Sequence, residues 1–568
     1  MRCALRAATR ATSLRAVRRF STVQQPIFSS AVETPHEHDN GLHHNASNGI
    51  IYNSAQTVQA ASASNPKADE GVSDAFHDQH DDIHDDKHHE PHEKHKRLGQ
   101  ELARHETVRE LLEVHARRID ELSGAAVCKF WGRLGRLAAR SVDERQWMRV
   151  NSSLVDPAAR HLKAQIEVLD PRSLTTIARS LASCRFTTTA TNEVWYQLIR
   201  RVNATAGDFE ASHLPKMLDA CASAGRTGPG IFPVLTQEAV KRTADGQDEA
   251  FTPPQYHTLL RATSRVNFRS QPLLVACAAG LYRKLDTLQL NPLVDIGFSY
   301  AVHNHRPLSL FGEKGMYAPL LRAALEEALE AERAVAGAAE PIGAELIAAE
   351  PAAAAEPAAA AEPAAAAERD DGDEEAEESS GGEGSSPRKR SAQIAEHLGA
   401  RVHQFRLWLD YERRSADASS CIAADSELAS RLLQNFVRSQ QRGSTGVAVQ
   451  RIQRTLRELG YEPEARVTPF GHVLPVVIRE DGVDVAIEVE TLNALVSRGG
   501  RLVGWHALRQ RQLRWLHEHE RAEMPLFLSM KDMRPQGATD DERNEKRRLV
   551  VEKAIRNLVH PGQAFKGE

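Results

Sequence analysis

The sequence lacks the short motifs of several common enzyme classes and the long apolar runs of membrane proteins. No stretch approaches the ~18 consecutive apolar residues that a bilayer-spanning helix needs. There is no glycine-rich phosphate loop, no H-E-x-x-H zinc motif and no G-x-S-x-G nucleophile turn. We therefore expect no membrane span, no cofactor and no metal site, and these motifs supply no catalytic residue.

Cysteine is also scarce, and the six cysteines form no C-x-x-C pair. Their scattered positions argue against a zinc ribbon and against a disulfide framework, and they fit a reducing compartment. Four of them fall within apolar helical segments, where we expect small core residues rather than nucleophiles. These four are Cys128, Cys184, Cys221 and Cys277.

The net charge of −5 says little because it averages regions of opposite sign. From Arg388 to the end, 30 Lys and Arg face 24 Asp and Glu, a net of +6. The first 25 residues hold six arginines and no acid, which is typical of an organellar import presequence. Because Arg18, Arg19 and Phe20 suit mitochondrial processing, we expect residues 1–20 to direct the protein to the mitochondrial matrix. A basic disordered tail is the alternative.

Residues 21–97 are polar and poor in aromatics, so they cannot offset the entropy of folding and we expect disorder. Seven histidines between His77 and His95 lie among Asp and Glu. Such a tract can bind zinc or copper. A solvated linker is the preferred interpretation, because no rigid scaffold fixes the geometry of the imidazoles.

Residues 98–335 show a repeated helical pattern. Five segments share an apolar core at i, i+1 and i+4, and successive segments are 47, 40, 42 and 37 residues apart. Repeats of about 40 residues with two helices each predict an α-helical solenoid, and a non-repetitive helical domain is the alternative. The core triplets are Phe130/Trp131/Leu134, Ile177/Ala178/Leu181, Met217/Leu218/Cys221, Leu259/Leu260/Thr263 and Ile296/Gly297/Tyr300.

Three of these repeats have similar turn residues at the start of a helix. Asp, Thr or Asn before proline predicts an N-cap followed by proline at the first helical position. The three pairs are Asp170-Pro171, Thr252-Pro253 and Asn291-Pro292.

Residues 336–390 have the composition of a linker between two folded halves. Four Glu-Pro pairs interrupt its alanine runs, and an acidic block follows. Residues 391–465 are predicted to be helical. Near their end, Val449, Ile452 and Leu456 form an apolar stripe, while a second stripe carries arginine. That arginine stripe is either a solvated face or a phosphate contact.

The segment Val483–Glu490 alternates apolar and polar residues, which predicts a strand with carboxylates on one face. An arginine-rich stretch with two tryptophans follows. Acidic strand and basic helix together indicate either a metal-dependent nuclease centre or a nucleic-acid-binding fold.

The order of these elements resembles a RAP domain, the C-terminal module of the FAST-kinase-domain proteins and of many helical-repeat RNA factors in organelles. The resemblance covers about residues 445–560. It implies a small α/β domain over 466–560 with a restriction-endonuclease-like core. The preceding repeats are similar to the octotricopeptide-like and heptatricopeptide-like arrays that accompany RAP domains. The matching segments are Leu459-Gly460, Ile487–Glu490, Arg501–Gly504, Leu508–Leu513, Met524–Leu528 and a helix around Leu549–Leu558.

The acidic residues depart from the nuclease pattern of that core. Glu488 and Glu490 match the family's acidic pair, but Pro475 stands where many RAP domains have an upstream aspartate, and no lysine completes the acid-x-lysine position. Asp484 and Glu488 are ~13 Å apart along a strand, too far to share a metal ion readily. We therefore expect pairing of Glu488 and Glu490 with nearby arginines. A degenerate endoribonuclease using these two glutamates is a further alternative.

These patterns favour a non-catalytic mitochondrial RNA-binding protein that acts in rRNA processing or assembly, mRNA stability or translation. Its partner would be mitochondrial rRNA or mRNA, with the helical repeats following an extended strand. The alternative of another class is a structural component of the mitochondrial ribosome or another ribonucleoprotein complex. The predicted RNA contacts are Arg498, Arg501, Trp505, Arg509, Arg511, Arg514, Arg451, Arg454 and Arg457.

Overall fold

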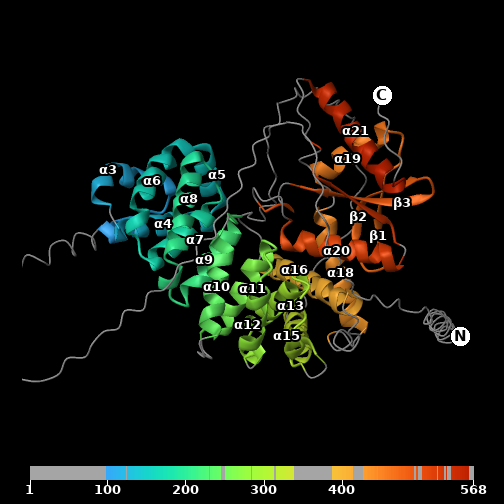
Figure 1. The fold of residues 1–568 in the computed structure, drawn as a ribbon, viewed down its shortest axis with the longest axis horizontal. Helices are drawn as coiled ribbons and strands as arrows, with labels where there is room; N and C mark the ends of the chain where they lie inside the picture. The colour runs from blue at the N-terminus through green and yellow to red at the C-terminus, as the bar shows by residue number, and fades with distance from the viewer. Residues whose placement is uncertain are drawn as a thin grey trace, which may run out of the picture. The chain divides into compact units, whose positions relative to one another are not determined.

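The protein is mostly helical, with one small mixed sheet near the C-terminus (Figure 1). None of the helices described is long and apolar enough to cross a membrane. The predicted presequence, the histidine-rich tract and most of the predicted linker lie outside the described residues. The computed structural model describes residues 98–122, 124–228, 230–244, 250–282, 284–312, 315–337, 387–412, 422, 426–443, 446–491, 494–496, 502–520, 522–529, 533 and 539–561.

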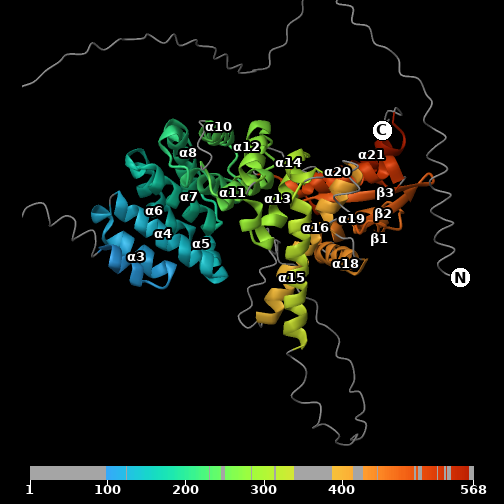
Figure 2. The same ribbon diagram turned by 90° about the horizontal axis from the view of Figure 1, so that it is seen from below.

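The helices before the sheet pack in two neighbouring rows, which Figure 2 shows side by side. In each row, each helix contacts the next one listed. The first row is α4 (Ala125–Arg140), α7 (Pro171–Cys184), α9 (His213–Ser223), α11 (Pro253–Arg265), α13 (Leu290–Val302) and α16 (Pro387–Leu407). The second row is α6 (Ser152–Gln165), α8 (Thr189–Ala204), α10 (Ile231–Ala244), α12 (Gln271–Tyr282) and α14 (Leu308–Phe311).

Further helices complete this part of the chain. Short 3-10 turns over Ile119–Glu121, Ile166–Val168, Ala206–Asp208 and Leu285–Thr287 join several helices, and a π-helical turn over Trp408–Glu412 ends α16. The further helices include α3 (Val108–Arg117), α5 (Val142–Val150), α15 (Tyr317–Gly337) and α18 (Ser426–Gly443), and residues 98–104 are also helical.

Turn residues before proline begin two of the row helices as the sequence predicts. Asp170 accepts a hydrogen bond from the Ser173 amide at 2.7 Å, with proline at the first helical position. Thr252 forms a capping box at the start of α11. The third such prediction is wrong, because α13 begins at Leu290, before Asn291 and Pro292. Proline fits there because the amides of the first turn have no helical partner.

The five core triplets are buried, as predicted, and their small residues allow close helix packing. A Cβ added at Gly135 of α4 would lie 2.6 Å from the Cα of Ser180 in α7. Gly297 makes room for the rings of Tyr317 and Phe405. The four cysteines in these helices are buried, free core residues, as predicted.

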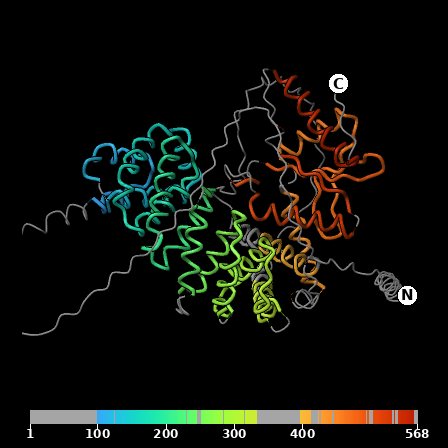
Figure 3. Tube along the Cα trace, in the orientation of Figure 1, coloured from blue at the N-terminus to red at the C-terminus, as the bar shows by residue number. Residues whose placement is uncertain are grey.

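One core continues across the segment that we expected to separate two halves. Helix α16 packs on α13, and Figure 3 shows the two traces adjacent. Phe405 and Trp408 pack against Phe311, and the Trp408 indole donates to Asn304 Oδ1 at 3.1 Å. The expectation of two independently folded halves is therefore wrong. Aromatic residues on both sides of the linker belong to the same hydrophobic core.

The sheet has the strand order β1-β2-β3-β4. The first three strands are antiparallel neighbours, and β4 pairs in parallel with β3. Asp481 and Gly482, both with positive φ, make the tight turn between β2 and β3. The strand predicted at Val483–Glu490 has these same bounds. The strands are β1 (Glu464–Val467), β2 (Val473–Glu480), β3 (Val483–Glu490) and β4 (Met524–Ser529).

Different helices pack on the two faces of the sheet. Helices α19 (Val447–Glu458) and α21 (Asp540–Val559) pack on the face that carries Val485 and Ile487. Helix α20 (Gly504–Glu520) joins β3 to β4 and packs on the opposite face, with Ala486 (Figure 1). Because side chains alternate along a strand, Glu488 lies on the α20 side.

Helix α20 also contacts the first row of helices. Its first residue, Gly504, approaches the carbonyl oxygen of Ser264 so closely that an added Cβ would overlap that oxygen. The same Cβ would lie 2.8 Å from Val302 of α13. Glycine at this position therefore lets α20 pack against the C-terminal ends of α11 and α13.

Candidate nucleic-acid interface

Glu488, the central carboxylate of β3, forms a two-point ion pair with Arg509 of α20. Arg509 Nη2 lies 2.6 Å from Glu488 Oε1, and Nε lies 3.1 Å from Oε2. Arg509 also donates to the Val473 carbonyl at 2.6 Å and to Gln440. The two side chains are only 10% and 16% exposed. A bidentate guanidinium satisfies both carboxylate oxygens, which offsets the burial of the two charges.

Glu488 and Arg509, two of the predicted site residues, are thus largely buried. Glu488 pairs with an arginine, as the sequence interpretation expected. Arg509 was predicted to hold an RNA phosphate, and that prediction is wrong because its guanidinium is buried against the sheet. Its donors already bind protein oxygens.

The other carboxylates of β3 have separate partners. Glu490 accepts from the Gln510 amide, and Asp484 accepts from Arg466 at 2.6 Å. The hydrogen bond from Arg466 lowers the pKa of Asp484. Among the residues that the structure describes, no group of three or more His, Cys, Asp or Glu side chains could hold a metal ion.

Arg511, the next predicted phosphate ligand, binds backbone oxygens of the helix row. Its guanidinium donates to the Val302 carbonyl at 3.0 Å and to the Ala301 carbonyl. These carbonyls lie at the C-terminal end of α13, where the helix dipole favours cations. Arg511 thus fixes α20 on α13, and its predicted role toward RNA is wrong.

Two of the predicted contacts on α20 are exposed. The Trp505 side chain is 50% exposed and stacks on His506, with ring centroids 3.4 Å apart. The exposed Arg514 lies over the Phe527 ring at 4.9 Å and 3.4 Å from Gln510 Oε1. Arg498 and Arg501 lie outside the described residues.

The arginines of α19 are on the opposite side of the sheet. Arg454 and Arg457 are exposed and Arg451 is partly buried. Arg454 pairs with Glu458 at 3.1 Å, one helical turn away. Within the described part of the chain, the guanidiniums of Arg451 and Arg457 make no hydrogen bond or ion pair. They are therefore available to a ligand.

Helix α21 adds two arginines that the sequence interpretation missed. Partial burial lowers the pKa of Arg547, as do the nearby guanidiniums of Arg451, Arg454 and Arg543, while Glu458 opposes them. The signal was hidden because basic and acidic residues alternate in this helix. We call Arg451, Arg454, Arg457, Arg543 and Arg547 the α19–α21 arginine surface.

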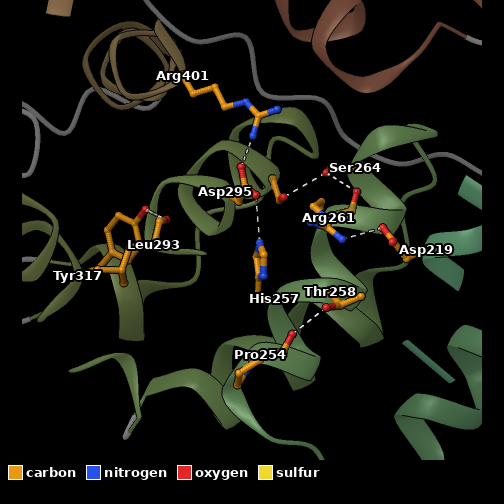
Figure 4. A network of polar contacts seen from close by, with 11 residues as sticks. Asp219, Pro254, His257, Thr258, Arg261, Ser264, Leu293, Asp295, Tyr317 and Arg401 are labelled. Atoms are coloured by element: carbon orange, nitrogen blue, oxygen red, sulfur yellow. Dashed lines mark hydrogen bonds and ion pairs between the residues drawn. The ribbon is translucent and has the colours of Figure 1, made fainter. Parts of the chain in front are cut away.

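A second group of arginines lies on the first row of helices and was not predicted (Figure 4). Asp295 of α13 accepts from His257 at 3.1 Å and pairs with Arg401 of α16. Arg261 of α11 pairs with Asp219 of α9 at 3.1 Å. Burial raises the pKa of Asp295, but the His257 hydrogen bond and the Arg401 charge give it a net lowering.

Arg265 completes this group at the C-terminal end of α11. Its guanidinium donates to Ser223 Oγ of α9. Partial burial lowers the pKa of Arg265, and the charges of Arg261, Arg401 and Arg185 lower it further, against Asp219. We call Arg185, Arg261, Arg265 and Arg401 the α11 arginine cluster. No sequence run predicts it, because its members come from three separate places: the end of α7, α11 and α16.

Comparisons with known proteins add no family to this geometry. No protein-family model matches the sequence, and a search of curated proteins finds no match. The residues themselves therefore carry the functional argument.

Proposed function

We propose that this protein is a non-catalytic RNA-binding protein of the mitochondrial matrix that acts in organellar RNA metabolism. The observation that carries the proposal is the α19–α21 arginine surface. Two of its guanidiniums, those of Arg451 and Arg457, have no partner within the described residues. RNA supplies the phosphates that such arginines bind.

The electrostatics of that surface support an anionic ligand. Arg547 lies among guanidiniums that lower its pKa, with Glu458 opposing them, and Arg543 pairs with Asp540. A phosphate close to these groups would relieve their mutual repulsion. The same interaction would release counterions from RNA, so binding should weaken steeply as salt increases.

The arrangement of elements supports the family part of the proposal. We propose that the two rows of helices form an α-solenoid and that the C-terminal sheet with α19, α20 and α21 is a RAP-like module. The two rows, in each of which a helix contacts the next one, favour the first, and the helix-strand-helix order after Val447 favours the second.

The proposal omits catalysis because of the way that Glu488 is bound. Both of its oxygens accept from Arg509, and Glu490 faces the Gln510 amide. A metal-dependent endoribonuclease would need these oxygens for the ion. The observed contacts of Glu488 and Glu490 therefore do not favour a degenerate nuclease.

Binding measurements on the full chain test the proposal. We expect Arg451→Ala with Arg457→Ala to weaken RNA binding about tenfold. The slope of log affinity against log salt should fall by about 1.4, since each lost single-strand phosphate contact contributes about 0.7. The matched control is Arg117→Ala with Arg160→Ala, two exposed arginines on α3 and α6.

An unchanged affinity and salt slope in the first variant would refute the role of this surface. Crosslinking and sequencing of bound mitochondrial RNA would identify the target. The arginine variants cannot separate a free RNA factor from a component of the mitochondrial ribosome, because both would use the same arginines. Sedimentation of the protein with or without ribosomal subunits distinguishes these two cases.

A further inference from the structure

The α11 arginine cluster gathers guanidiniums whose charges act on one another. Arg261 and Arg401 lower the pKa of Arg265, and both also lower the pKa of Asp295. Pairing holds two of the arginines in place, because Arg401 contacts Asp295 and Arg261 contacts Asp219. Arg401 and Arg261 remain 32% and 39% exposed. The cluster is thus both ordered and accessible to an anion.

Helix α20 begins against the end of α11 that carries Arg265. Gly504 contacts the carbonyl of Ser264, and Trp505 and Arg265 are the next residues along each chain segment. Both of these side chains are exposed. The contact between α20 and α11 therefore places the residues Trp505 and Arg265 at the same helix junction, although 240 positions separate them in sequence.

The ring of His506 covers one face of the Trp505 indole without adding charge. His506 stacks on the indole with an interplanar angle of 30°. Burial lowers the pKa of His506 to about 3, and the Arg509 charge contributes. The imidazole is therefore neutral near pH 7. A nucleobase stacks on such an aromatic surface, whereas an acidic peptide gains only the charge interaction.

We propose that this junction is a second binding site for single-stranded RNA. A phosphate binds among Arg261, Arg265 and Arg401, and the adjacent base stacks on Trp505. The site is formed only where α20 meets α11, so it requires both the helix row and the C-terminal sheet. This inference rests on the proposed function, but it uses residues separate from the α19–α21 arginine surface.

A labelled oligouridine 20-mer and the full-length protein test this site. We expect Trp505→Ala to weaken binding about tenfold or more, as for loss of one stacked base. Arg265→Gln should lower the salt slope by about 0.7. Tyr196→Ala, which removes an aromatic ring 69% exposed on α8, is the matched control and should leave the affinity unchanged.

Photocrosslinking gives a direct readout. An oligonucleotide of 5-bromouridine should crosslink to the peptide that contains Trp505, as identified by mass spectrometry. Wild-type affinity in both junction variants would overturn the inference, and so would equal competition by a polyglutamate of the same charge.

The two proposals fail in different ways. Loss of binding only in the α19 variants would refute the junction site and keep the proposed function. Loss only in the junction variants would support the junction site and refute the role of the α19–α21 surface. If wild-type protein binds neither the oligouridine nor mitochondrial RNA, both proposals are wrong.

Discussion

Helix α20 is packed between the sheet and the helix row, whereas helix α19 packs on the sheet and leaves its arginine stripe exposed or only partly buried. Both helices carry arginines at short spacing. On α20, Arg509 binds Glu488 and Arg511 binds the end of α13. On α19, Arg451 and Arg457 bind nothing in the described part of the chain. The number of surfaces that cover a helix thus decides whether its arginines hold the fold or face a ligand.

The largest effect should come from breaking the buried pair on α20. We expect Arg509→Met to lower the free energy of unfolding by about 3–5 kcal/mol, because Glu488 would remain charged and buried without its partner. Chemical denaturation of the full-length protein measures this change. The double variant Arg509→Met with Glu488→Met should recover much of the loss, since it removes both charges. A double variant as unstable as the single one would contradict this account.

The pH dependence of stability should depend on the buried His403 and not on the exposed arginines of α19. Burial lowers the pKa of His403 to about 4, with Arg406 adding to the shift and the Phe470 carbonyl opposing it. The unfolded state binds a proton near pH 6.5 and the folded state does not until about pH 4. Protonation of this histidine therefore lowers the free energy of unfolding by about 1.4 kcal/mol per pH unit as pH falls from about 6.5 to about 4.

The variant His403→Gln tests this slope. The glutamine amide can still donate to Phe470 but does not titrate. We expect the stability of the variant to depend less on pH between 6.5 and 4, measured by denaturation at each pH. Arg457→Ala is the control and should leave the slope unchanged. An identical slope in His403→Gln would show that this histidine does not link folding to pH.

A side chain at Gly504, where α20 contacts the helix row, should disturb that contact. We expect Gly504→Ala to cost about 1–3 kcal/mol, because the added methyl group overlaps the Ser264 carbonyl and crowds Val302. Thermal unfolding measures the loss. Gly207→Ala is the matched control, since a Cβ there meets no atom within 4 Å. Equal stability of the two variants would mean that α20 can shift away from α11 at little cost.

Local periodicity predicted the elements of this fold well. The alternation of Val483–Glu490 predicted a strand with those bounds, and the i, i+1, i+4 triplets predicted the core of the first row. The caps at Asp170 and Thr252 were also predictable, because a cap depends on residues only a few positions apart. Each of these signals is contained within one turn or one strand.

Partners distant in sequence were not predictable. Arg509 lies 21 residues from Glu488, and Arg511 lies 210 residues from Ala301. The α11 arginine cluster likewise draws Arg401 from beyond the predicted linker to Asp295. A single sequence gives the charge of each residue but not which helix will lie against it. The site predictions therefore failed where tertiary packing chose the partners.

The smallest effect should come from the exposed end of α20. Arg514 lies over the Phe527 ring and near Gln510, but among the described residues it pairs with no buried carboxylate. We expect Arg514→Ala to change the free energy of unfolding by about 1 kcal/mol or less, the size of an exposed cation–π contact. Denaturation alongside Arg509→Met measures the difference between two arginines of the same helix. If Arg514→Ala lowered the free energy of unfolding as much as Arg509→Met, burial would not decide how much each arginine stabilises the fold.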